Sequence, residues 1–243
     1  MSRHTYQTGL IGNCSFLAHV HKNTNIEWLC WPRFDSSFIF GGLLDKEKGG
    51  QFTILPEGEF TTDQYYLENT NVLCTEVTCS GGRYRVYDFA PRFRQYDRYF
   101  KPLMLARKIE VLEGTPRIRV ICEPVCDYGR SKMKRYRGSN HIQFEGCADP
   151  MRLTTNIPIS YIYEGQYFVL SETKYLALTY GQPLEAALNS TMEDFFRKTV
   201  DYWRIWIKHP SIGQFHQKYV TRPALPLKIH QFEDTGAIIA AST

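Results

Sequence analysis

Short apolar runs that alternate with polar residues and end at glycine-containing turns fill the first three quarters of the chain. Residues 10–20 and 27–30 frame a turn at 22–25, and residues 72–79 and 84–89 flank Ser-Gly-Gly-Arg, where glycine supplies the positive φ of a tight hairpin. Residues 157–163 and 167–170 flank Glu164-Gly165, which predicts another hairpin. The pattern predicts a mainly β fold, an antiparallel two-sheet β-sandwich over residues 1–183.

After Pro183 the hydrophobic spacing changes to a helical period. Ser190, with Glu193 three residues later, predicts a capped helix start, and Pro210 predicts the end of that helix. The residues that recur at helical spacing are Phe195, Phe196, Thr199, Val200, Trp203, Trp206 and Ile207.

A second helical segment is predicted from about residue 212, with Leu225, Ile229 and Phe232 on one side. Pro223 and Pro226 lie inside it, so we expect a kinked helix or one that begins only near Pro223. The apolar run 237–241 is expected to be buried, either against the sandwich or against a part of the protein beyond Thr243.

Composition and charge narrow the classes of partner. The net charge of +4 does not favour nucleic acid, and the basic cluster between Gly129 and Gly138 is predicted to be an exposed loop or hairpin tip. No stretch approaches the length of a membrane span. Aromatic residues make up 14% of the chain, which favours β structure and is compatible with surfaces that stack on sugars.

The cysteines predict neither a metal site nor a disulfide framework. There are seven, with no C-x-x-C pair and no zinc-finger spacing, and residues 1–11 do not resemble a signal peptide. We therefore expect reduced thiols, a cytoplasmic location, and no metal or cofactor.

Several motifs occur in a specific order. The first two are Gly-Leu-Ile-Gly-Asn-Cys-Ser-Phe-Leu (9–17) and Trp-Leu-Cys-Trp-Pro-Arg-Phe-Asp-Ser-Ser (28–37). They are followed by Thr-Asn-Val-Leu (70–73), Asp88-Phe89 with Pro91, Val-Thr-Arg (220–222) and Gly-Ala-Ile-Ile-Ala-Ala (236–241). In order and spacing this resembles the opening of bacterial family-15 glycoside hydrolases, the glucoamylase and trehalase-like group.

The resemblance implies three parts: an N-terminal supersandwich over residues 1–183, a linker helix over 184–210, and the first helix of an (α/α)6 catalytic barrel over 211–243. In this family the barrel carries two catalytic glutamates and hydrolyses α-glucosides with inversion. The resemblance places both glutamates beyond Thr243, so no catalytic residue is assigned in this chain. The expected partners are the barrel and, in the longer protein, an α-glucoside. The sequence Arg222-Pro223-Ala224-Leu225-Pro226 departs from the family, which commonly has Arg-Ser-Ala-Leu and then a non-proline residue.

Trp31, Arg33, Phe34 and Asp35 are the candidate substrate-binding residues. An indole face can stack on a sugar ring while a guanidinium and a carboxylate bind hydroxyls, and the resemblance implies that this loop faces the barrel. The alternative is structural, with an Arg33–Asp35 pair and aromatics packed between sheets.

Three other positions have structural interpretations. Asn13 is expected to be a turn residue after Gly12, which would adopt the special backbone angle. Trp203 and Trp206 are expected at a seam between linker and sandwich, and Arg222 is expected to pair with a barrel acid or to be solvated. For the chain as a whole, the alternative function is a stand-alone carbohydrate-binding or protein-interaction module.

Overall fold

One long antiparallel sheet runs through the molecule. The computed structural model describes residues 7–209 and 217–243. The eight strands follow the order β15-β16-β17-β19-β11-β8-β7-β6. Their bounds are β6 (Phe60–Tyr66), β7 (Leu73–Cys79), β8 (Gly82–Phe89), β11 (Met104–Gly114), β15 (Lys134–Arg137), β16 (His141–Glu145), β17 (Met151–Thr155) and β19 (Lys174–Tyr180).

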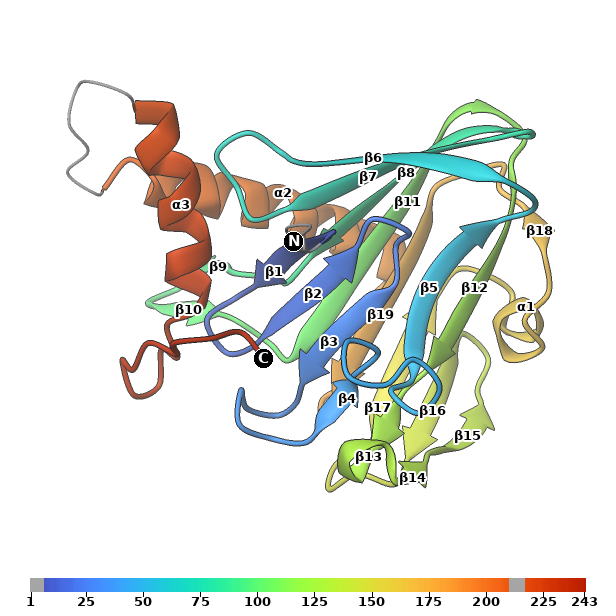
Figure 1. The fold of residues 1–243 in the computed structure, drawn as a ribbon, viewed down its shortest axis with the longest axis horizontal. Helices are drawn as coiled ribbons and strands as arrows, with labels where there is room; N and C mark the ends of the chain where they lie inside the picture. The colour runs from blue at the N-terminus through green and yellow to red at the C-terminus, as the bar shows by residue number, and fades with distance from the viewer. Residues whose placement is uncertain (1–6, 210–216) are drawn as a thin grey trace, which may run out of the picture.

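Two smaller sheets cover one face of the long sheet (Figure 1). One has the order β1-β2-β3-β4 and the other β18-β12-β5. Their strands are β1 (Thr8–Gly12), β2 (Leu17–His21), β3 (Ile26–Cys30), β4 (Phe38–Phe40), β5 (Gln51–Pro56), β12 (Arg117–Glu123) and β18 (Phe168–Val169). The expected mainly β sandwich is confirmed.

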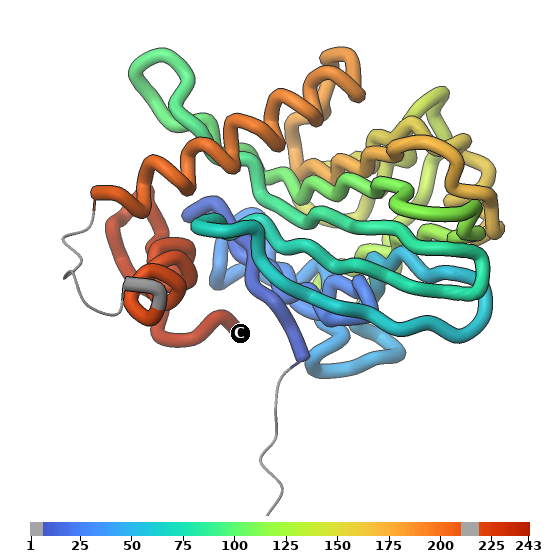
Figure 2. Tube along the Cα trace, turned by 90° about the horizontal axis from the view of Figure 1, so that it is seen from above, coloured from blue at the N-terminus to red at the C-terminus, as the bar shows by residue number. Residues whose placement is uncertain are grey.

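Alternation along the strands divides the apolar side chains between two layers. In β11, Leu105 and Ile109 belong to the core between the sheets, whereas Met104 and Ala106 belong to the cluster that includes Met192 of α2 (Leu188–Trp206). Figure 2 shows α2 lying along the outer face of the long sheet. The long sheet is therefore buried on both faces where α2 covers it.

The β7–β8 hairpin forms as predicted, with Cys79 paired to Gly82, and a turn at 22–25 joins β2 to β3. The run 10–20 is broken, however, because residues 13–16 form a loop between β1 and β2.

Two helix starts differ from expectation. The expected strand at 157–163 contains helix α1 (Ile159–Tyr163), where Ile159 and Ile162 are buried at helical spacing. Helix α2 begins at Leu188 with no side-chain cap; the Ser190 hydroxyl instead donates a hydrogen bond to the carbonyl of Ala187, 3.2 Å away. Pro210, the predicted end of this helix, lies outside the described residues.

The second predicted helix is α3 (Gln217–Ile229), and it runs through both Pro223 and Pro226. A start near Pro223 is therefore wrong, and residue 212 lies outside the described residues. Each proline removes one backbone donor, so packing must hold this helix. Leu225 and Ile229 supply that packing because both are buried.

The smaller elements are the β9 (Phe93–Gln95) and β10 (Arg98–Phe100) hairpin, the 3-10 turn η1 (Asp127–Gly129), and the β13 (Val125–Cys126) and β14 (Ser131–Lys132) pair. The basic cluster is exposed, as expected, but part of it forms β15, an edge strand of the long sheet. Among the described residues no helix is long and apolar enough to cross a membrane.

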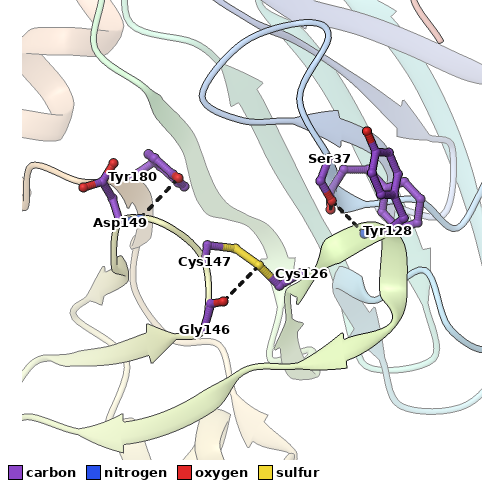
Figure 3. The surroundings of a disulfide bond; sticks show 8 residues. Ser37, Cys126, Tyr128, Gly146, Cys147, Asp149 and Tyr180 are labelled. Atoms are coloured by element: carbon purple, nitrogen blue, oxygen red, sulfur yellow. Dashed lines mark hydrogen bonds between the residues drawn. A yellow bond between two sulfur atoms is a disulfide. The ribbon is translucent and has the colours of Figure 1, made fainter.

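The expectation that all cysteines are reduced is wrong at one pair. Cys126 and Cys147 form a disulfide with a Cα–Cα distance of 5.8 Å (Figure 3). The two are 21 residues apart in sequence, and folding brings the turn after β16 beside β13, a proximity that cysteine spacing does not reveal. Cytoplasmic location stays a prediction.

Candidate functional site

Helix α3 and residues 230–243, here called the C-terminal segment, pack against the end of the sandwich that carries β1 (Figures 1 and 2). We call this contact region the seam. Its apolar part joins Leu225 and Ile229 of α3 to Trp203 of α2 and to Leu10 of β1. Trp203 is thus in the seam, as expected.

Gly12 is where the backbone of the sandwich comes closest to α3. A Cβ at Gly12 would lie 3.2 Å from the Cβ of Ile229 and 2.7 Å from the carbonyl oxygen of Phe16. The expected special backbone angle is not at Gly12 but at Cys14, whose φ is 69°. Gly12 is needed for close approach, not for a positive φ.

Asn13 is fully buried and holds three segments together. Its amide donates hydrogen bonds to the carbonyls of Pro91 (3.2 Å) and Pro102 (2.8 Å), and its oxygen accepts one from the backbone N–H of Ser15 (3.1 Å). The turn role is therefore only part of its function, because Asn13 also ties the β1–β2 loop to the segments that flank the β9–β10 hairpin.

Arg92 is the charged centre of the seam. Its guanidinium donates to both carboxylate oxygens of Glu233 at 2.8 Å and to the carbonyl of Asn13 at 2.8 Å. It also lies over the rings of Tyr99 (4.8 Å) and Tyr202 (4.9 Å). One buried cation thereby links the sandwich, the hairpin, α2 and the C-terminal segment.

A second polar contact holds α3. Arg222 donates a hydrogen bond to the carbonyl of Thr70 at 2.7 Å and lies 3.5 Å from the centre of the Tyr66 ring. Asn71, in turn, donates to the carbonyl of Leu225 at 2.9 Å. Arg222 is therefore not simply solvated, because it binds the β6–β7 turn; its pairing with an acidic group of the barrel stays a prediction.

The C-terminal segment folds back on the sandwich. The backbone N–H of Glu233 donates to the carbonyl of Cys14 (3.0 Å), and Nε2 of His19 lies 2.8 Å from the Ser242 hydroxyl. The apolar run 237–241 is nevertheless mostly exposed, and Ile238 is 70% exposed. The expected burial of this run does not occur within the described residues.

Several titratable groups in this region have shifted pKa values, and those of Glu233 and His19 decide its charge near neutral pH. The hydrogen bonds from Arg92 lower the pKa of Glu233, against an opposing effect of burial. Burial, and next the charge of His230, lower the pKa of His19 to about 4. Glu233 is consequently held ionised and His19 neutral at pH 7.

The four predicted binding residues do not form one site. Trp31 is only 2% exposed and packs edge-on against Phe16, with ring centres 5.3 Å apart. Its indole face therefore cannot stack on a sugar in this arrangement, and the expected structural alternative describes it.

Arg33, Phe34 and Asp35 do come together, in the exposed loop between β3 and β4. Nε of Arg33 is 3.1 Å from Asp35, and both side chains are well exposed, at 60% and 72%. The rings of Phe34 and Phe232 meet edge-on at 5.8 Å, and the Arg33 guanidinium lies 5.5 Å from the centre of the Phe232 ring. This loop thus lies against the C-terminal segment, and its binding role stays a prediction.

The chemistry that this region offers is binding and positioning. Its carboxylates are paired with basic side chains: Asp35 and Glu233 with arginines, and Asp234 with Lys101. Within residues 7–209 and 217–243 no group of three or more His, Cys, Asp or Glu side chains is placed to hold a metal ion.

Sequence reasoning missed Arg92 and Glu233 altogether. The available signal was position: Arg92 directly follows the Asp-Phe-Ala-Pro motif, and Glu233 lies between two conspicuous apolar stretches. The motifs that carry the family resemblance at 9–17, 70–73 and 220–222 supply seam contacts, and the motif at 88–91 directly precedes Arg92. The ordered motifs therefore mark the seam more than a substrate site.

Comparisons with known proteins support the family resemblance that these motifs carry. Residues 3–163 match the family model described as trehalase-like, N-terminal. The chain is 30% identical over 245 residues to a protein named trehalase from Thermoplasma volcanium, a match that covers 97% of this chain and 39% of that protein.

Other curated proteins give the same result. A trehalase from Mycolicibacterium smegmatis is 27% identical over 267 residues, covering 97% of this chain and 39% of that protein. Trehalase 1 from Sulfolobus acidocaldarius is 32% identical over 203 residues, covering 81% of this chain and 33% of that protein. The chain spans about two fifths or less of the length of these relatives. No solved structure gave a significant match.

Proposed function

The chain belongs to the trehalase-like N-terminal family, and from this premise we propose that it is the non-catalytic N-terminal domain of a family-15 glycoside hydrolase. The full-length protein would hydrolyse an α-glucoside such as trehalose with inversion and release glucose. Inversion needs two carboxyl groups about 6.5–9.5 Å apart, and we assign both to a catalytic domain beyond Thr243.

The proposed division of the chain is a supersandwich over residues 1–183, a linker over 184–210 and the first barrel helix over 211–243. The position of α2 along the outer face of the sandwich suits a linker. The boundary between Pro210 and Ser211 lies outside the described residues.

One observation carries this proposal: α3 is bound to the sandwich on one side and exposes apolar residues on the other. Leu225 and Ile229 are buried in the seam, whereas Leu227 is 65% exposed and Val220 is also exposed. The exposed run 237–241 follows α3 after residues 230–236. Apolar surface of this kind marks an interaction site, and a catalytic barrel that begins with α3 would cover it.

The buried seam gives the domain its proposed task. Asn71 and Arg222 hold α3, and Arg92 holds the C-terminal segment, through directed hydrogen bonds, so the orientation of the first barrel helix would be set by the sandwich. We further propose that Arg33, Phe34 and Asp35 border the barrel, because their loop contacts Phe232. The stand-alone module is the weaker alternative, since the trehalase matches cover nearly all of the chain.

The test is product analysis with the full-length protein. Trehalose, maltose, isomaltose and soluble starch are supplied separately, and the first glucose released is observed by proton NMR before mutarotation. From trehalose, inversion is expected to release one β-glucose, from the ring that water attacks, and one α-glucose, from the leaving ring; from soluble starch it is expected to release β-glucose. Initial release of α-glucose alone from trehalose or starch would contradict the inverting mechanism, and no release from any of the four would contradict the glycosidase assignment.

A further inference from the structure

A cleft lies between helix α2 and the β9–β10 hairpin, away from the loop of Arg33 and Asp35. Its volume is about 660 Å³, and its walls include Tyr99 from the hairpin and Tyr202 and Trp206 from α2. Asp201, Arg94 and His209 supply polar groups to the same walls. The volume falls in the range of about 300–1,000 Å³ that is typical of small-molecule sites.

The aromatic walls are fixed from behind. The rings of Tyr99 and Tyr202 meet edge-on with centres 5.7 Å apart, and both contact the guanidinium of Arg92, which is itself buried and held by Glu233. Trp206 packs edge-on against the buried Trp203, with ring centres 6.1 Å apart. Rings held in this way lose little conformational freedom when a ligand stacks on them.

Several polar groups of the cleft have no partner. Among the described residues, the Asp201 carboxylate, the Trp206 indole N–H and the Tyr99 hydroxyl make no hydrogen bond or ion pair, and each is at least partly exposed. Aromatic faces beside unpaired acceptors and donors match a molecule with an apolar ring face and a rim of hydroxyl groups.

We propose that this cleft binds a neutral saccharide, a glucoside of two or three pyranose rings. One sugar ring stacks on Trp206 or Tyr99, and its hydroxyl groups bind Asp201 and the indole N–H. The ligand class follows from the residues that line the cleft, so this proposal goes beyond the proposed function and does not depend on it. Trp203 is buried inside the seam, whereas Trp206 packs against the edge of the same apolar cluster and also lines the cleft.

The test is saturation-transfer NMR on the 243-residue chain with maltotriose and with trehalose. Sorbitol is the matched control ligand because it carries hydroxyl groups but no pyranose ring to stack. We expect transfer to at least one saccharide and none to sorbitol. Trp206→Leu should weaken saccharide binding about tenfold through loss of stacking, and Asp201→Ala about fivefold through loss of a charged hydrogen bond.

Tyr96→Ala is the matched protein control, since Tyr96 lies at the tip of the same hairpin and does not line the cleft. It should leave binding unchanged. Near-UV circular dichroism of each variant confirms that the fold is retained, and the exposed Asp201 keeps the test valid if Trp206→Leu loosens α2.

Absence of transfer to both saccharides, or transfer that survives both cleft variants, would overturn the proposal. Because no step of this experiment measures glucose release, its failure would leave the glycosidase assignment intact. A failed product analysis would likewise leave this cleft unaffected.

Discussion

The core between the sheets and the seam at α3 are both buried, but different forces hold them. The core is a continuous apolar cluster with one buried ion pair, in which Nε of Arg107 is 2.6 Å from Asp88. The seam has only a few apolar side chains. Asn71, Arg92 and Arg222 hold it through hydrogen bonds to the carbonyls of Leu225 and Thr70 and to the carboxylate of Glu233.

The core and the seam therefore have different tasks: the core makes the sandwich fold, and the seam positions α3 on it. Apolar burial is not directional, so it makes the sandwich stable without fixing the orientation of an added helix. Hydrogen bonds to carbonyls from opposite ends of the chain fix both distance and angle. We therefore expect core variants to unfold the domain and seam variants to release α3 and the C-terminal segment first.

The largest effect is expected from Asp88→Ala in the core. The Arg107 guanidinium is fully buried and also binds the carbonyls of Phe52 and Thr24, so it would lose its only carboxylate partner without reaching water. Leaving a buried charge unpaired costs about 3–5 kcal/mol. Urea denaturation followed by tryptophan fluorescence measures this loss.

The double variant Asp88→Leu with Arg107→Met is the control, because it removes both charges. Its stability should recover most of the loss. A loss below about 1 kcal/mol in Asp88→Ala would mean that the pair does not stabilise the core as described.

The next effect is expected from Arg92→Ala in the seam. The variant removes the paired hydrogen bonds to Glu233 and the contacts with two tyrosine rings, together worth about 3 kcal/mol. We expect rapid hydrogen exchange at the Glu233 amide while β11 stays protected. Arg94→Ala, which breaks an exposed ion pair with Asp97 in the neighbouring hairpin, is the matched control and should change exchange little. Equal exchange in β11 and at Glu233 would show that the seam does not open separately.

Acid should weaken the seam through His19. Its pKa is about 4 in the folded chain against an ordinary 6.5, so the unfolded chain binds more protons between these values. The contribution of neutral His19 to the free energy of unfolding is therefore fully present above its ordinary pKa of 6.5, and it is lost as the pH falls toward about 4. The decrease from about pH 7 to about pH 5 should be about 2 kcal/mol. His19→Gln should remove that part of the pH dependence, and an unchanged pH profile would contradict the shift.

The smallest effect on stability is expected at Arg33. Its pair with Asp35 is exposed, and such pairs contribute about 0–1 kcal/mol. Arg33→Ala should therefore leave the urea midpoint almost unchanged. If the loop borders the barrel as proposed, the same substitution in the full-length protein should raise KM for the α-glucoside. A large loss of stability without a change in KM would show that Arg33 stabilises the fold and has no role at the border with the barrel.

The sequence predicts the core better than the seam for a physical reason. Alternation and turn glycines are local, and they correctly predict the β7–β8 hairpin and the packing of α2. The bond between Asn71 and the carbonyl of Leu225 joins residues 154 apart and depends on no repeat. The same holds for Arg92 and Glu233, which are 141 apart. The errors at α1 and α3 are local exceptions, in which buried Ile159, Ile162, Leu225 and Ile229 outweigh propensity.

Trp31 shows the limit of residue type as a guide to a site. A tryptophan beside an arginine and an aspartate suits sugar binding, yet burial against Phe16 and Tyr180 removes it from the surface. Arg33 and Asp35 stay exposed, whereas Phe34 is partly buried against Phe232. Their contact with Phe232 required the fold of the C-terminal segment, which the sequence alone did not predict.

The most direct test of the account is a parallel assay of trehalose hydrolysis by the purified 243-residue chain and by the full-length protein. The account predicts that the full-length protein releases glucose and that the chain alone does not, because the catalytic carboxyl groups are assigned beyond Thr243. Sustained glucose release by the 243-residue chain would contradict that assignment and place catalysis within the sandwich or α3.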